Sequence, residues 1–104
     1  INTAGEKVYP EEVEEVLKTF PGVTDALVVG VPDEKWGQMV TGVVQPEPGA
    51  ALDEAALQAH VRGHLAGYKT PKRILFKDSL GRASNGKADY KGITAFAKET
   101  LGVA

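Results

Sequence analysis

Ala26-Leu27-Val28-Val29-Gly30-Val31 and Met39-Val40-Thr41-Gly42-Val43-Val44 are the two stretches that decide the fold of this chain. Both are rich in β-branched residues, which favour extended backbone. The segment between them, residues 32–37, is rich in turn-forming residues, and residues 46–49 close the second run. We therefore expect two adjacent antiparallel strands.

Three segments with helical periodicity surround these strands. Pro10 suits the first turn of a helix over residues 10–20, whose glutamates we expect on solvated faces. Asp53 is expected to cap a second helix that Gly67 ends, and residues 89–101 predict a third. The expected apolar stripes are Val13, Val16, Leu17 and Phe20 in the first helix, Leu57, Val61 and Leu65 in the second, and Ile93, Phe96 and Leu101 in the third.

A further extended run, residues 73–77, lies between the second and third helices. The order helix, two strands, helix, strand, helix predicts an α+β fold in which helices cover a small sheet of about three strands. The chain has 104 residues, of which 42% are hydrophobic and 25% charged. This length supports one compact core, so we expect residues 1–104 to form a single domain.

Composition excludes several classes of function. The formal net charge is only -2, with acidic and basic residues well mixed, so we expect no nucleic-acid partner. The absence of cysteine excludes disulfides, thiolate metal sites and a cysteine nucleophile, and fits the cytoplasm. We expect no transmembrane segment and no secretory signal.

Because the chain begins at Ile1 without a methionine, we also expect it to be part of a longer protein, although a processed terminus would look the same.

Lys87 follows Asn85 and Gly86, a pair that forms tight turns because both residues tolerate positive φ. A lysine at the lip of such a turn could enter the cleft of another domain. The ordinary interpretation of its position is a solvated surface lysine.

Two longer stretches change that interpretation: Leu80-Gly81-Arg82-Ala83-Ser84-Asn85-Gly86-Lys87-Ala88-Asp89-Tyr90 and Thr3-Ala4-Gly5-Glu6-Lys7-Val8-Tyr9-Pro10-Glu11-Glu12-Val13-Glu14. Together they resemble the carboxy-terminal lid domain of the adenylate-forming enzymes, and bacterial fatty-acyl or steroid-acyl CoA ligases in particular. The resemblance implies that Lys87 is the catalytic lysine of acyl-adenylate formation and that Arg82, Asn85 and Gly86 support its loop. Gly81 and Ser84 stand where the family usually has proline.

The resemblance also implies that Gly5, Glu6 and Lys7 border the channel for the pantetheine arm of CoA. An ordinary turn glycine before a helix is the alternative for Gly5. Lys69, Lys72 and Arg73 could meet phosphates of ATP or CoA, and Trp36 could stack on an adenine ring or simply pack against its neighbours. His60 and His64 have a spacing that can bind zinc, but no third ligand is near in sequence, so we expect no metal site.

The function implied is that of an ATP-dependent acyl-CoA synthetase, an acid-thiol ligase. ATP and CoA would be co-substrates, and Mg²⁺ would bind with ATP through a large amino-terminal domain. That domain and the hinge to it are absent from this chain, so the fragment alone is expected to be inactive. The acid would be a fatty or steroid acid, and a lipophilic acid would favour a peripheral position at a membrane. The alternatives are a peptide-synthetase-type or luciferase-like adenylating domain, or a non-catalytic α+β ligand-binding or regulatory module.

Overall fold

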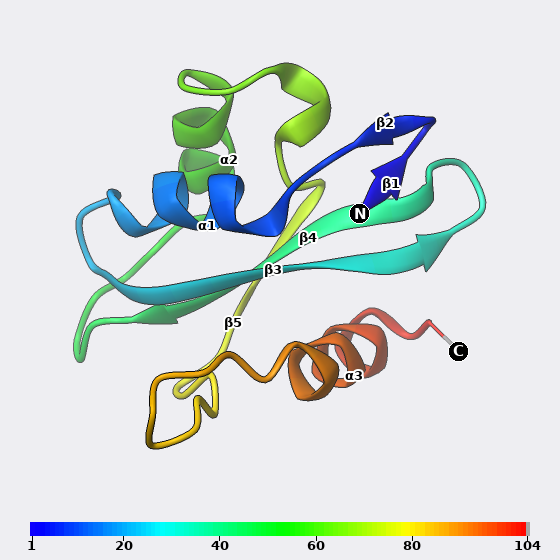
Figure 1. Ribbon diagram of the computed structural model, residues 1–104. Helices are drawn as coiled ribbons and strands as arrows, with labels where there is room; N and C mark the ends of the chain where they lie inside the picture. Colours follow the sequence, from blue (N-terminus) through cyan, green and yellow to red (C-terminus); the bar gives the residue numbers. More distant parts are fainter. Residues whose placement is uncertain (104) are drawn as a thin grey trace.

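The computed structural model describes residues 1–103 of the chain (Figure 1). Its elements are β1 (Asn2–Thr3), β2 (Glu6–Lys7), α1 (Pro10–Lys18), β3 (Val23–Asp33), β4 (Gly37–Pro46), α2 (Glu54–Arg62), the 3₁₀ helix η1 (Gly67–Lys69), β5 (Arg73–Phe76) and α3 (Tyr90–Leu101). The expected α+β class and the expected order of the three helices and three longer strands are confirmed.

The sheet contains five strands rather than about three. The two additional strands, β1 and β2, form an antiparallel hairpin in which Thr3 pairs with Glu6. Each is only two residues long, too short for a periodic pattern to be recognised. The hairpin joins the sheet because Thr3 also pairs with Gly37 at the start of β4.

Strand β4 is the centre of the sheet. It pairs with β3 in antiparallel register, with Val28 opposite Gly42, and with β5 in parallel register, with Gly42 opposite Ile74. The predicted antiparallel pair of long strands is therefore confirmed. A parallel partner requires a crossover connection, and α2 lies in the segment that supplies it.

Two helices end earlier than the sequence suggested. α1 ends at Lys18 instead of Phe20, because the Thr19 hydroxyl donates to the Val16 carbonyl 2.6 Å away and Thr19 becomes the C-cap. α2 ends at Arg62, with Gly63 as its C-cap, and Gly67 begins η1 instead of ending α2. Asp53 does cap α2, since its carboxylate accepts from the Ala56 amide at 3.0 Å.

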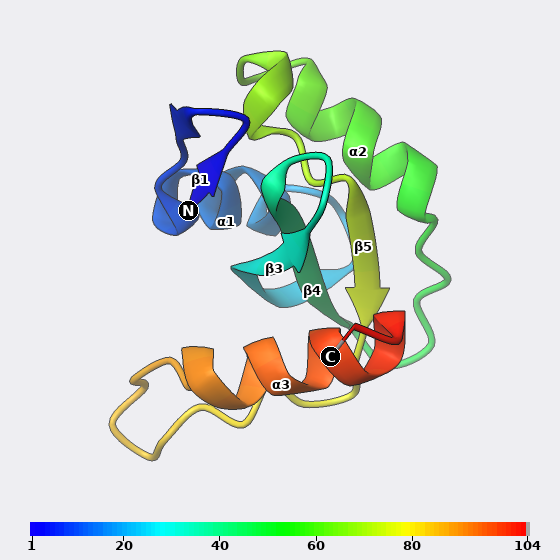
Figure 2. The same cartoon turned by 90° about the vertical axis from the view of Figure 1, so that its right-hand side faces the viewer.

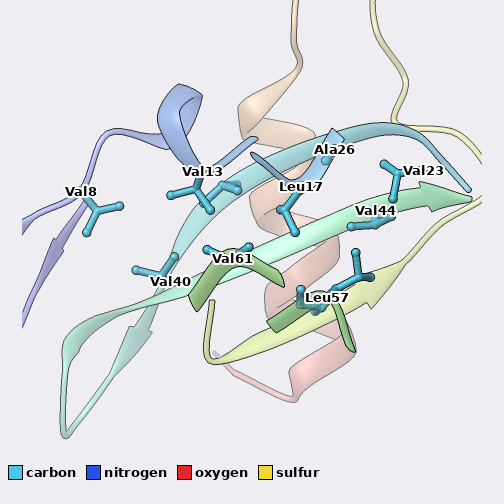
Figure 3. Packing of buried hydrophobic residues seen from close by; sticks show 11 residues of the cluster. Val8, Val13, Leu17, Val23, Ala26, Val40, Val44, Leu57 and Val61 are labelled. Carbon is cyan, nitrogen blue, oxygen red and sulfur yellow. The ribbon is translucent and has the colours of Figure 1, made fainter. Parts of the chain in front are cut away.

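The helices cover both faces of the sheet, α1 and α2 on one and α3 on the other (Figure 2). Alternate side chains of β3 enter the two cores, as the two-residue period of a strand requires. Ala26 and Val28 meet α1 and α2, whereas Leu27 and Val29 meet α3. Figure 3 shows the first core, where side chains from α1 and α2 converge on β4: Val13, Leu17, Leu57, Val61, Val40 and Val44.

Strand β3 is an edge strand, and a buried carboxylate caps one amide on its free edge. Glu14 of α1 is only 4% exposed, and its Oε2 accepts a hydrogen bond from the Val28 amide at 2.9 Å. The expectation that all the glutamates of this helix are solvated is therefore wrong for Glu14. At Val28 the edge therefore has no free donor for another chain, and blocking an edge in this way is a common protection of sheets.

Candidate functional site

Lys87 lies on an exposed loop between β5 and α3. Inside this loop, the Gly86 amide donates to the Ala83 carbonyl at 2.8 Å, and the Ala83 amide donates to the Lys87 carbonyl at 3.1 Å. Among residues 1–103, no carboxylate lies within ion-pair distance of the Lys87 ammonium group. The structure therefore presents this cation to solvent on a loop that is closed by its own backbone.

The residues before Lys87 form the predicted turn. Gly86 has a φ of +82°, a conformation that strains residues with a Cβ atom. The Asn85 side chain accepts a hydrogen bond from the Lys87 amide at 3.0 Å, which closes an Asx turn over Gly86. Asn85 and Gly86 thus set the direction in which the chain passes through Lys87.

Arg82 anchors this loop to the sheet. Its guanidinium donates to both carboxylate oxygens of Asp25 in β3, at 2.6 and 3.1 Å, and to the Gly86 carbonyl at 3.1 Å. Burial alone would raise the pKa of Asp25, but hydrogen bonds from Arg82 and from the Ala26 amide, with the charge of Arg82, lower it below its usual value. The same bond to Asp25 raises the pKa of Arg82. A bidentate arginine pair of this kind has a well-defined geometry, so the loop is held in register with β3.

A second anchor holds the other end of the loop. The Tyr90 hydroxyl lies 2.8 Å from Oε2 and 3.1 Å from Oε1 of the buried Glu14 carboxylate. Burial raises the pKa of Glu14, although hydrogen bonds from the Val28 amide and from Tyr90 oppose the rise. Sequence reasoning missed Asp25, Glu14 and Tyr90. Glu14 is one of the four glutamates at positions 11, 12, 14 and 15, and nothing in their order identifies it as the buried one.

Gly5 occupies a different part of the molecule, the tip of the β1–β2 hairpin. Ala4 and Gly5 have φ values of +50° and +83°, which are typical of the two central residues of a tight hairpin turn. Glu6 and Lys7 follow in β2 and are exposed. The Ala4 amide donates to the Trp36 carbonyl at 2.7 Å, so the hairpin is attached to the turn between β3 and β4.

Trp36 and Lys72 come together beside this hairpin. The ammonium group of Lys72 lies 4.5 Å from the centre of the Trp36 ring, and that of Lys35 lies 5.0 Å from it. Trp36 itself is half-buried, and its amide donates to the Asp33 carboxylate at 2.9 Å. Two cations therefore lie against the indole of a residue whose backbone contacts the hairpin at Ala4, an arrangement suited to an anionic ligand with a flat ring.

The other two predicted phosphate contacts are engaged within the domain. Lys69 pairs with Glu12 of α1 at 2.6 Å, a bond that raises the pKa of Lys69. Arg73 pairs with Glu54 of α2 at 3.0 Å, and the same Glu54 oxygen accepts from the Ile74 amide at 2.7 Å. Both cations thus connect helices of one face to the segment around β5, and the structure does not bring them to Trp36.

His60 and His64 lie one helical turn apart, with ring centres separated by 4.6 Å. Nε2 of His60 lies 2.7 Å from the Thr19 hydroxyl and 3.1 Å from the Val16 carbonyl, so it serves the contact between α1 and α2. Across the described part of the chain, no three His, Asp or Glu side chains gather as metal ligands do. Within residues 1–103, no helix has the length and apolar character needed to cross a membrane.

The site residues therefore form two groups, which lie on different sides of the molecule. In Figure 1 the hairpin with Gly5 is blue and lies above the sheet at the upper right, on the same side of the sheet as α1 and α2, and the loop with Lys87 is orange and lies below the sheet at the lower left, beside α3. Figure 2 again places them at the top and the bottom of the molecule. A single ligand bound at one group would leave the other free.

Comparison of the sequence with known proteins identifies relatives of this chain. The family model described as AMP-binding enzyme C-terminal domain matches residues 12–87. The medium/long-chain-fatty-acid–CoA/3-oxocholest-4-en-26-oate–CoA ligase of Mycobacterium tuberculosis is 54% identical over 91 residues, covering 88% of this chain and 17% of that protein. The 3-oxocholest-4-en-26-oate–CoA ligase of Rhodococcus rhodochrous is 47% identical over 103 residues, covering 99% of this chain and 18% of that protein.

A solved structure agrees with these matches. The Mycobacterium tuberculosis fatty acyl CoA synthetase superposes with a TM-score of 0.89 at 33% identity, covering 96% of this chain and 20% of that one. The chain thus spans about a fifth of the length of these relatives. Because the family model covers most of the chain, including Lys87, and the folds agree, this chain belongs to the AMP-binding enzyme C-terminal domain family.

Proposed function

We propose that this chain acts as the carboxy-terminal domain of an ATP-dependent acyl-CoA ligase, joined through a hinge to a large amino-terminal domain. The ligase would convert a carboxylic acid, ATP and CoA into acyl-CoA, AMP and pyrophosphate through an acyl-adenylate. The names of the relatives support this activity, and the share of their length that the chain spans supports a second, larger domain. On the same basis we propose a fatty or steroid acid as the substrate.

The observation that carries the proposal is the exposed Lys87 cation on its anchored loop, with no ion pair among residues 1–103. When a carboxylate attacks the α-phosphate of ATP, two anionic groups approach one another. A positioned ammonium group between them stabilises the charge that both share in the transition state. Lys87 would supply that group when the domain closes on the nucleotide pocket, which together with Mg²⁺ we assign to the amino-terminal domain.

The second group of residues would serve the second half-reaction, in which the CoA thiol attacks the acyl-adenylate. The hairpin around Gly5 would border the pantetheine arm, with Glu6 and Lys7 beside it. Trp36 and Lys72 would meet the nucleotide end of CoA. Since these residues lie away from the Lys87 loop, the domain would have to turn between the two half-reactions to present each group to the same cleft.

The test is a Lys87→Ala variant of a full-length ligase that carries this domain. Acyl-adenylate formation should fall by about two to three decades, as it does when a preorganised charged donor is removed. Thioester formation from preformed acyl-adenylate should be unchanged. Lys91→Ala is the matched control, because Lys91 is an exposed lysine of α3 only four positions away. If Lys87→Ala forms acyl-adenylate at the normal rate, the proposal is wrong, and a regulatory or ligand-binding module becomes the better interpretation.

A further inference from the structure

The loop that carries Lys87 has almost no apolar packing of its own. Residues 83–87 are all exposed, and the nearest buried side chains are Leu80 before the loop and Ile93 after it. Loops without buried contacts are among the first parts of a protein to open. Beyond the partly buried Ala88, which packs against the core under α3, the conformation of residues 83–87 therefore depends on polar contacts.

Those contacts hold the loop at both ends on the same strand. At the first end, Arg82 connects Asp25 of β3 with the Gly86 carbonyl, directly before Lys87. At the second end, Tyr90 donates to Glu14, whose carboxylate also accepts from the Val28 amide of β3. Only two residues separate Lys87 from Tyr90, so displacement of Tyr90 would reach Lys87 directly.

The contact between Tyr90 and Glu14 contributes more to geometry than to packing. Tyr90 is 37% exposed, so its ring is only partly covered, while Glu14 is 4% exposed and carries the desolvation penalty of a buried carboxylate. Burial and the nearby Glu14 raise the pKa of Tyr90, so the phenol keeps its proton and remains a donor at neutral pH. A fixed acceptor and a permanent donor define one position for the start of α3.

We infer that Tyr90 is a positioning residue for Lys87, acting through its hydrogen bond to Glu14; this rests on the proposed role of Lys87 in adenylation. Tyr90 does not touch the reacting groups. It holds the end of the loop while Arg82 holds the beginning, so that the ammonium group enters the cleft of the other domain in one orientation. A catalytic cation displaced by about 1 Å loses much of its effect, which gives the bond kinetic importance.

The first experiment measures both half-reactions of Tyr90→Phe in a full-length ligase carrying this domain. We expect kcat for acyl-adenylate formation to fall about tenfold, and thioester formation from preformed acyl-adenylate to stay within about twofold of the parent. Tyr68→Phe is the control, since Tyr68 has a similar exposure of 39% and lies in η1, away from the loop. An equal loss in both half-reactions would mean that Tyr90 is merely structural and would overturn the inference.

A double-mutant cycle separates this inference from the proposed function. In a Lys87→Ala background, Tyr90→Phe should cause no further loss of adenylation, because a residue that acts through Lys87 has nothing left to position. A further tenfold loss would overturn the positioning role while leaving the role of Lys87 intact. If Lys87→Ala alone leaves adenylation unchanged, the proposed function fails and the positioning role fails with it.

Variants of Glu14 provide a second line of test that keeps the phenol. In Glu14→Gln, an amide oxygen in place of Oε2 still accepts from both the Val28 amide and Tyr90, so adenylation should stay within about threefold of the parent. Glu14→Leu leaves Tyr90 without its acceptor and should match the Tyr90→Phe loss. Hydrogen exchange of the full-length variants should be faster over residues 82–90 in Glu14→Leu and Tyr90→Phe only. Normal adenylation in Glu14→Leu would contradict the inference.

Discussion

Gly81 shows how a single residue changes what fixes the conformation of the Lys87 loop. Its φ is +69°, a region closed to proline, which stands here in the family motif that this chain resembles. Its amide also donates to the Ser79 hydroxyl at 3.3 Å, a bond that proline could not make. The loop therefore relies on the side chain of Arg82, rather than on a proline ring, to define its beginning.

Restoring proline at this position should weaken the domain. We expect Gly81→Pro to lower the free energy of unfolding by about 1–3 kcal/mol, because the ring requires a negative φ and removes the amide donor. Gly81→Ala should cost about 1 kcal/mol, since its Cβ meets no neighbour and only the positive φ opposes it. Urea unfolding of the two variants gives both values. A stabilised Gly81→Pro variant would show that the loop begins with the family's usual backbone.

At the scale of elements, β3 makes two contacts with ionisable side chains that are partly or fully buried. Glu14 of α1 covers the Val28 amide, and Asp25 near the beginning of the same strand binds Arg82. Burial dominates for Glu14 and raises its pKa, whereas hydrogen bonds and the charge of Arg82 dominate for Asp25 and lower its pKa. The contributions of these two carboxylates to the free energy of unfolding therefore change in opposite directions as the pH falls.

These shifts predict the pH dependence of stability. Glu14 binds its proton more readily in the folded state, so its contribution should increase as the pH falls from neutral toward 4.5, its ordinary value. Asp25 contributes stability above its ordinary value of 3.8, and that contribution should be lost as the pH falls through its lower folded value. Unfolding free energies measured from pH 7 to pH 2 should therefore rise and then fall.

Two variants show which carboxylate causes the rise in stability and which causes the fall. Glu14→Gln should flatten the rise above pH 4.5, and Asp25→Asn should reduce the loss below pH 3.8. Glu54→Gln is a useful comparison, because the pKa of Glu54 is also lowered by bonds from the Ile74 amide and Arg73 that outweigh its burial. An unchanged acid limb in Asp25→Asn would mean that the pair with Arg82 contributes little in solution.

At the scale of the whole molecule, the sheet separates two surfaces. The Lys87 loop lies on the side of α3, and the Gly5 hairpin lies on the side of α1 and α2 (Figures 1 and 2). The hairpin is bonded to the backbone of Trp36, whose ring lies against Lys72. A mutation in one group should therefore affect one half-reaction and leave the other unchanged.

Lys72→Ala tests the surface opposite Lys87. In a full-length ligase we expect about a fivefold increase in KM for CoA, the effect of losing one exposed contact with a phosphate, and unchanged adenylation. Arg73→Ala is the informative comparison. Because Arg73 pairs with Glu54, its removal should reduce stability and leave KM for CoA near the parent value. An effect of Lys72→Ala on adenylation alone would contradict the division between the two surfaces.

Several features of the fold and site follow from residues close together in sequence. The periodic stripes of α1, α2 and α3, the cap at Asp53 and the turn at Asn85 and Gly86 were all predicted, because neighbouring residues determine helix caps, periodicity and positive φ. The prediction that Lys87 stands exposed on a turn is likewise confirmed.

The sequence by itself therefore determined the three helices, the three longer strands, their order and the placement of Lys87 on a tight turn. Only the tertiary structure decided what holds that turn, since Arg82 and Asp25 are 57 positions apart and Tyr90 and Glu14 are 76 apart. It also separated Lys72, which meets Trp36, from Arg73, which pairs with Glu54. The physical reason is that a charged side chain has many possible partners in sequence, and the pairing of β3, β4 and β5 selects which of them lie within reach.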